Sequence, residues 1–109
     1  MTIKEKIKLL IPDLPIPIYY LKRPDEERNC IVYTYTETPA LVGDMKELGT
    51  KYTILFNLYC ADNVEDTKEL IKIALKQHGF KKKIILGTIL ENNALYNTAM
   101  QYYIGLKSN

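Results

Sequence analysis

The sequence predicts an α+β domain in which a mostly antiparallel sheet of about five strands carries two helices on one face. Strand-like runs rich in β-branched and aromatic residues support this prediction, as do two runs with the 3.6-residue apolar period of a helix. These runs follow one another in the order α-β-β-β-α-β-β. A chain of 109 residues has room for one core, so residues 1–109 are expected to form a single domain.

Composition and charge argue against several classes of protein. Hydrophobic residues make up 47% and charged residues 26%, which is typical of a globular domain, and the net charge of +2 is too small to indicate a nucleic-acid partner. No apolar run approaches the ~20 residues that span a bilayer, and the start of the chain lacks a signal-peptide core. We therefore expect neither a membrane partner nor secretion. Cys30 and Cys60 fit a reducing compartment better than a disulfide scaffold.

The first predicted elements are a short helix and an edge strand. Thr2 and Glu5 have the spacing of a capping box, which begins the helix, and Pro12 ends it. Pro15 and Pro17 are two residues apart, so in an extended chain their missing N–H groups fall on the same side. That side cannot pair with another strand. The segment "PDLPIPIYYL" is therefore expected to form an edge strand whose unpaired side is protected by proline.

The next two strands are expected to form a hairpin with a tyrosine-rich second face. They cover about residues 29–38 and 51–60, and a hairpin centred on the loop between them places residue 30 near 60 and residue 34 near 56. One face then holds the core residues Cys30, Val32, Thr34, Ile54, Phe56, Leu58 and Cys60. The other face holds Tyr33, Tyr35, Leu55 and Tyr59. A small monomer has little reason to build such a face.

The loop between these strands, "TPALVGDMKELGT", is long for a hairpin connection. It carries four apolar residues, Leu41, Val42, Met45 and Leu48. Two interpretations stand. The four side chains either fold back onto their own sheet or contact a neighbouring subunit.

The main helix is expected in "ADNVEDTKELIKIALKQHGF", with Asp62 or Asn63 as its N-cap and Gly79 as its stop. Its apolar stripe comprises Val64, Thr67, Ile71, Ala74, Leu75 and His78. Ile73 points away from this stripe and is a candidate contact residue. The runs "KKKIILGTIL" and "LYNTAMQYYIGL", joined by the turn residues "ENNA", predict a second hairpin.

The residues that carry catalytic chemistry are scarce. His78 is the single histidine, at the end of the helix, where a capping or packing role is expected. The single serine is Ser108, so a serine nucleophile with a histidine base is not expected. The two cysteines lack the close spacing of a zinc site, and no glycine-rich loop could hold a phosphate. We expect no enzyme, no metal and no cofactor.

The order of these features resembles the small tail-terminator or tail-completion proteins of tailed bacteriophages. The resemblance rests on "PDLPIPIYY", "NCIVYTYTET", "KYTILFNLYCADN", "KQHGF" and "NALYNTAMQYYI", which together span nearly the whole chain. In particular, a strand ends in an aromatic residue and an acidic turn, here Tyr59 to Asp62, before the main helix. The last strand carries a tyrosine followed by small polar residues, here Tyr96 to Thr98.

The resemblance implies a structural virion protein, assembled in the bacterial cytoplasm, that is not an enzyme. Members form rings, commonly hexameric, that cap the tail tube and join it to the head connector or stopper protein. The partners would be other copies of the chain, the tail-tube protein and the connector, with DNA only passing through the ring. Neighbours would then cover the second sheet face and the long loop. The alternative is a small α+β binding module, monomeric or dimeric, that contacts nucleic acid through the lysines at 81–83.

Overall fold

The computed structural model describes residues 2–25, 27–42, 46–91 and 94–107, with the backbone alone at 40–42 and 46–48. The elements are α1 (Ile3–Leu10), the 3-10 turn η1 (Ile11–Asp13), β1 (Ile18–Tyr20), β2 (Cys30–Val42), β3 (Lys46–Cys60), α2 (Val64–Gln77), β4 (Lys81–Ile85), β5 (Ile89–Leu90) and β6 (Tyr96–Lys107). Six strands form one sheet in the order β1-β2-β3-β6-β4, with β5 also paired to β6. The pair β1–β2 is parallel and the other pairs are antiparallel. The predicted α+β class is confirmed, with six strands rather than about five.

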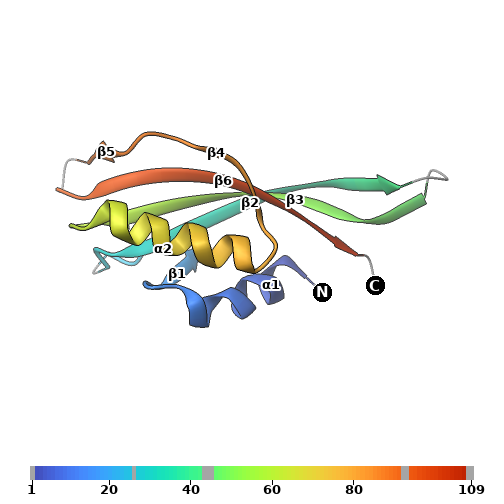
Figure 1. Cartoon of the computed structure of the whole chain (residues 1–109), viewed down its shortest axis with the longest axis horizontal. Helices are drawn as coiled ribbons and strands as arrows, with labels where there is room; N and C mark the ends of the chain where they lie inside the picture. The colour runs from blue at the N-terminus through green and yellow to red at the C-terminus, as the bar shows by residue number, and fades with distance from the viewer. Residues whose placement is uncertain (1, 26, 43–45, 92–93, 108–109) are drawn as a thin grey trace.

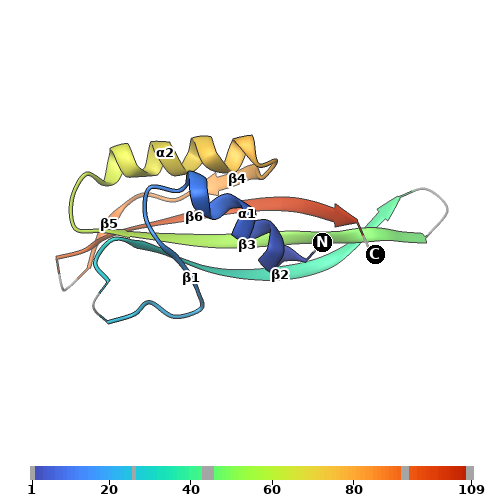
Figure 2. The same cartoon turned by 90° about the horizontal axis from the view of Figure 1, so that it is seen from below.

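Both helices contribute to a core on one face of the sheet, which we call the covered face. Ile7 and Leu10 of α1 and Ile71 and Leu75 of α2 pack in the same buried cluster as Phe56 of β3. Figure 2 shows α2 lying along the sheet on that side. The molecule measures 51 × 24 × 23 Å, and the end of the β2–β3 hairpin reaches beyond α2 (Figure 1).

The beginning of the chain follows the prediction closely. Thr2 accepts a hydrogen bond from the Glu5 backbone N–H, and the Thr2 N–H donates to the Glu5 carboxylate at 2.9 Å, which completes the capping box. The strand β1 is an edge strand, since it pairs with β2 alone. Pro15 and Pro17 precede β1 rather than lying within it, and the Pro17 carbonyl accepts a hydrogen bond from the Ile31 N–H at 2.8 Å.

The main helix has the predicted ends and the predicted phase. Asn63 is its N-cap, in the left-handed region with φ 51°, and Gly79 follows its end with φ 87°. Ile71 is fully buried whereas Ile73 is 53% exposed, so the apolar stripe faces the sheet as expected. His78 is the C-cap, and its Nε2 lies 2.6 Å from Oδ2 of Asp13. This contact ties η1 to the end of α2, which is a packing role.

The register of the first hairpin differs from the prediction by one residue. Cys30 lies opposite Tyr59 rather than Cys60, and Tyr33 lies opposite Phe56. A bulge between Ala40 and Leu41 shifts the pairing, and no sequence pattern marks it. Because side chains alternate along a strand, this shift exchanges the two faces of β2. Tyr33 and Tyr35 therefore lie on the covered face, and Cys30, Val32 and Thr34 on the opposite one.

The predicted long loop at 39–50 is also wrong. The strands continue through most of it, because Pro39 pairs with Thr50 and Val42 pairs with Lys46. Leu41 and Val42 therefore belong to β2, and Leu48 belongs to β3. Met45 lies outside the described residues. The continuation of the strands was not recognisable in the sequence, because the segment contains Pro39 and two glycines, and these residue types usually interrupt a strand.

Candidate interaction surfaces

The sheet face turned away from the helices, which we call the open face, is uncharged over its centre. Along β2, β3 and β6 it presents the half-buried residues Thr34, Thr53, Leu55, Asn57, Tyr59, Ala99, Gln101 and Tyr103. Charged groups occur at its two ends. Arg23 lies over the Tyr59 ring at 5.4 Å, and Lys51 lies over the Tyr103 ring at 4.8 Å. Between these two cations, the face offers apolar, hydroxyl and amide groups alone.

Two of the tyrosines predicted for this face belong to the core instead. Tyr33 is 5% exposed, and its ring lies 5.2 Å from that of Tyr20 and 6.4 Å from that of Phe56. Tyr35 packs edge-on against Tyr52 at 5.6 Å. The placement of Tyr33 and Tyr35 on the second face is therefore wrong. Leu55 and Tyr59 do lie on it, as expected.

The two cysteines lie on adjacent strands but on opposite faces. Cys60 packs in the core beneath the helices, whereas Cys30 is buried on the side of the open face, so the prediction of a shared core face is wrong. Both are free thiols. Burial raises the pKa of the Cys30 thiol and of the Cys60 thiol above the usual range, which favours the unreactive protonated form.

Most of the exposed large apolar side chains in the described part of the chain fall into two groups. The first group, which we call the β1 edge, comprises Leu9 of α1, Ile11 of η1, and Tyr20 and Leu21 at the end of β1. The second group, which we call the β4 edge, comprises Ile84, Leu86, Ile89 and Leu90 of the segment from β4 to β5, with Tyr96 opposite Leu90 on β6. The predicted contact residue Ile73 is exposed on α2 together with Leu70.

Sequence reasoning missed both edges. For the β4 edge a signal was present, because "IILGTIL" is apolar on both parities and contains no charge. A strand with that pattern has two apolar faces, and only one of them can face this chain's core. For the β1 edge no comparable signal exists, because Leu9 lies within α1 and Ile11 directly follows it, so both residues read as part of the apolar character of that helix.

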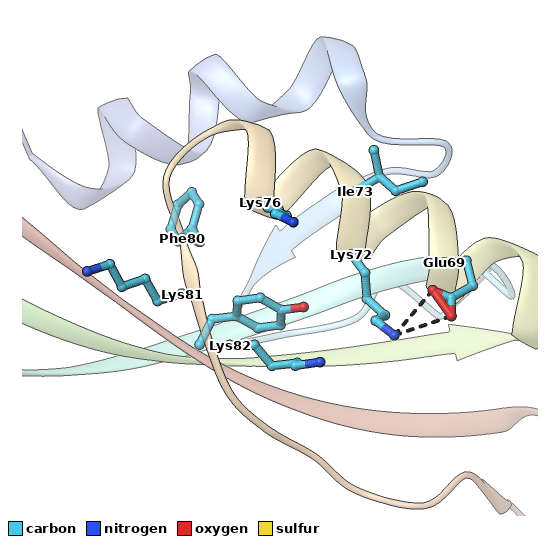
Figure 3. A pocket seen from close by; sticks show the side chains of 8 residues that line it. Glu69, Lys72, Ile73, Lys76, Phe80, Lys81 and Lys82 are labelled. Carbon is cyan, nitrogen blue, oxygen red and sulfur yellow. Dashed lines mark hydrogen bonds and ion pairs between the residues drawn. The ribbon is translucent and has the colours of Figure 1, made fainter.

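A groove of about 550 Å³ lies between α2 and β4 (Figure 3). It is lined by Glu69, Lys72, Ile73, Lys76, Phe80, Lys81, Lys82 and Tyr102. The Lys72 ammonium lies 3.2 Å from the Glu69 carboxylate, which offsets part of the positive charge. Lys81 and Lys82, which the sequence offered as a nucleic-acid contact, therefore share a groove with two lysines of α2. Such a rim of ammonium groups suits an anionic group.

Within the residues that the structure describes, no three side chains of the His, Cys, Asp and Glu types gather as a metal site would require. Neither of the helices described is long and apolar enough to cross a membrane. No model of a known protein family matches this chain, and no curated protein matches it significantly. The surfaces described above therefore carry the functional inference.

Proposed function

We propose that this chain is a structural virion protein of the tail-terminator kind that its sequence resembles. Copies would form a ring, hexameric as is common in that family, that caps the tail tube and joins it to the head connector. The observation that carries the proposal is the open face. A sheet face that faces bulk water permanently usually carries charges, and along β2, β3 and β6 the described residues of this face include none between Arg23 and Lys51.

The composition of the open face suits a surface that other proteins cover. Tyr59 and Tyr103 each combine a large apolar ring with a hydroxyl, and Asn57 and Gln101 can donate and accept hydrogen bonds across an interface. Interfaces are depleted of charge at their centre and keep a polar rim, which is the arrangement seen here. The partners would be the tail-tube protein and the connector, within a particle assembled in the bacterial cytoplasm.

The proposal is tested by deleting the gene from the phage or prophage that carries it. We expect heads and tails that fail to join, seen by electron microscopy, and restored joining when the wild-type protein is supplied in trans. The variant Leu55→Lys, which places a charge at the centre of the open face, should fold but fail to restore joining. Glu65→Lys, an exposed change on α2, is the matched control and should restore it. Normal particles after the deletion would contradict the proposal.

A second candidate function is suggested by the lysine groove. A small binding module could hold an anionic ligand, including nucleic acid, against Lys76, Lys81 and Lys82. Fluorescence anisotropy with labelled single- and double-stranded DNA tests this. Binding that weakens steeply with salt, and that is lost in the Lys81→Ala/Lys82→Ala variant, would favour this candidate over the virion protein. Absence of binding at low salt would remove it.

A further inference from the structure

We infer that copies of this chain join head to tail, with the β4 edge of one copy packed against the β1 edge of the next. This inference deepens the proposed function, since it rests on the ring proposed there and identifies the surfaces that close it. Each edge of one copy therefore binds the other edge of a neighbouring copy of the same chain.

The exposed apolar side chains are unevenly distributed over the surface. Nine of the large apolar residues exposed in the described part of the chain fall into the β1 edge and the β4 edge, with exposures between 38% and 63%. The remaining two, Leu70 and Ile73, lie on α2. In Figure 1, β4 and β5 run along the upper edge of the sheet, and α1 and β1 lie below it. Surface apolar residues are ordinarily scattered, so their concentration at opposite edges indicates two contact surfaces.

The backbone of the β4 edge is open to pairing with another strand. Among the described strands, β4 and β5 pair with β6 alone, so the outer side of each is open to another strand. Proteins usually protect such edges with lysines and bulges. Lys81, Lys82 and Lys83, with the bulge between Lys82 and Ile84, protect the first half of this edge in that way. From Ile84 to Leu90 neither device is present.

The β1 edge also has an open backbone. Strand β1 pairs with β2 through three residues, Ile18 to Tyr20, and the outer side of β1 is not paired with any described strand. Pro15 and Pro17 protect the segment before it, but Leu21 directly after it is 61% exposed. Each edge therefore combines backbone that is open on its outer side with exposed aliphatic side chains.

The two edges also differ in symmetry from a dimer contact. A two-fold dimer needs one self-complementary surface, whereas two unlike surfaces at opposite ends give a head-to-tail contact that closes into a ring or continues as a filament. The β1 edge and the β4 edge are unlike and lie at opposite ends of the strand order, so a second copy of the chain can supply the partner surface for each.

The test uses two variants that each block one edge. Ile89→Lys/Leu90→Lys changes the β4 edge, and Leu9→Lys/Leu21→Lys changes the β1 edge. Because all four side chains are exposed, thermal midpoints should stay close to that of the wild type. The matched control is Leu70→Lys/Gln77→Lys, which changes two exposed residues on α2.

Sedimentation velocity is measured up to about 1 mM chain, because association depends on concentration. We expect the wild type and the α2 control to self-associate and each edge variant to remain monomeric, with at least about a tenfold weaker association. The decisive sample is an equimolar mixture of the two edge variants. Each retains one intact edge, so the mixture should form a dimer and nothing larger.

Four results would overturn the inference: a wild type that stays monomeric throughout, an edge variant that associates normally, a control that fails to associate, or a mixture that stays monomeric. Failure of the proposed function is distinguishable. A wild type that associates through its edges but does not restore head–tail joining refutes the function and leaves the inference standing. Edge variants that restore joining as well as the wild type refute the inference alone.

Discussion

Tyr33 of β2 lies directly opposite Phe56 of β3, with ring centroids 6.4 Å apart, on the face that the helices cover. Phe56 also meets Phe80 and Tyr102 edge-on, each at 6.1 Å. These rings come from β2, β3, β6 and the link between α2 and β4, so they fix the centre of the core. The high tyrosine content of the chain is therefore partly a core feature. Only some of the tyrosines are available to an interface.

The aromatic core leads to a first prediction, for Tyr33→Ala. We expect the free energy of unfolding to fall by about 3–5 kcal/mol, as for other large aromatic side chains removed from a core. The matched control is Tyr59→Ala on the open face, which should cost clearly less because Tyr59 is only half-buried. Urea denaturation measures both. Equal losses would mean that the pairing of β2 with β3, which places Tyr33 opposite Phe56, is wrong.

A second prediction compares two isoleucines of α2. Ile71→Ala removes methylene and methyl groups from a fully buried site, so it should cost about 2–5 kcal/mol. Ile73→Ala should cost far less in an isolated subunit, because that side chain is 53% exposed. Chemical denaturation at low protein concentration separates the two. A larger loss for Ile73 than for Ile71 would contradict the helix orientation.

A third prediction uses two glycines of the sheet. A Cβ atom at Gly49 would overlap the Leu106 carbonyl oxygen of the neighbouring strand, whereas a Cβ at Gly105 would meet open space. Gly49→Ala should therefore destabilise the fold by about 1–3 kcal/mol, since β3 and β6 must separate to make room. Gly105→Ala is the control and should change the thermal midpoint little. A larger loss of stability for Gly105→Ala than for Gly49→Ala would mean that β3 and β6 are not as close at Gly49 as the structure shows.

A fourth prediction concerns the thiols. Cys30 and Cys60 should both be titrated as free groups after denaturation without reductant, and both should alkylate slowly in the folded protein. Their pKa values are raised by burial, so above about pH 8.5 the unfolded chain loses protons that the folded chain retains. Stability present at neutral pH is therefore lost as the pH rises from that value through the folded pKa values.

The pH dependence is checked by urea midpoints at pH 7 and pH 9.5. The wild type should lose more stability over this interval than the Cys30→Ala/Cys60→Ala variant, which has no thiol to ionise. The interval stays below about pH 10, where tyrosines of the unfolded chain ionise and would add their own effect. Equal losses in both proteins would contradict the account of the thiols.

The sequence contained enough information for the helices but not for the ends and the pairing of the strands. The phase of α2, its stop at Gly79 and the capping box at Thr2 and Glu5 follow from local patterns, and the structure confirms each of them. The register of β2 against β3 depends on a bulge at Ala40 and Leu41. No single residue type specifies such a bulge, and a shift of one residue exchanges the two faces of a strand.

The surfaces were predictable only in part. The uncharged character of Leu55 and Tyr59 was visible in the sequence, and both residues lie on the open face. The β4 edge was not predicted, because exposure of Ile89 and Leu90 depends on which strand ends the sheet. That order is a tertiary property, set when β6 inserts between β3 and β4. A short apolar strand has the same sequence pattern whether it lies in the centre of a sheet or at its edge.

The central claim is that this chain caps the tail tube as a ring, and electron microscopy of tubes tests it most directly. Tail tubes are assembled from a purified phage tail-tube protein, incubated with the purified wild-type chain, and imaged with Leu55→Lys and Glu65→Lys as comparisons. We expect an added ring at one end of each tube with the wild type and with Glu65→Lys, and bare ends with Leu55→Lys. Tube ends that stay bare with the wild-type protein would contradict the account.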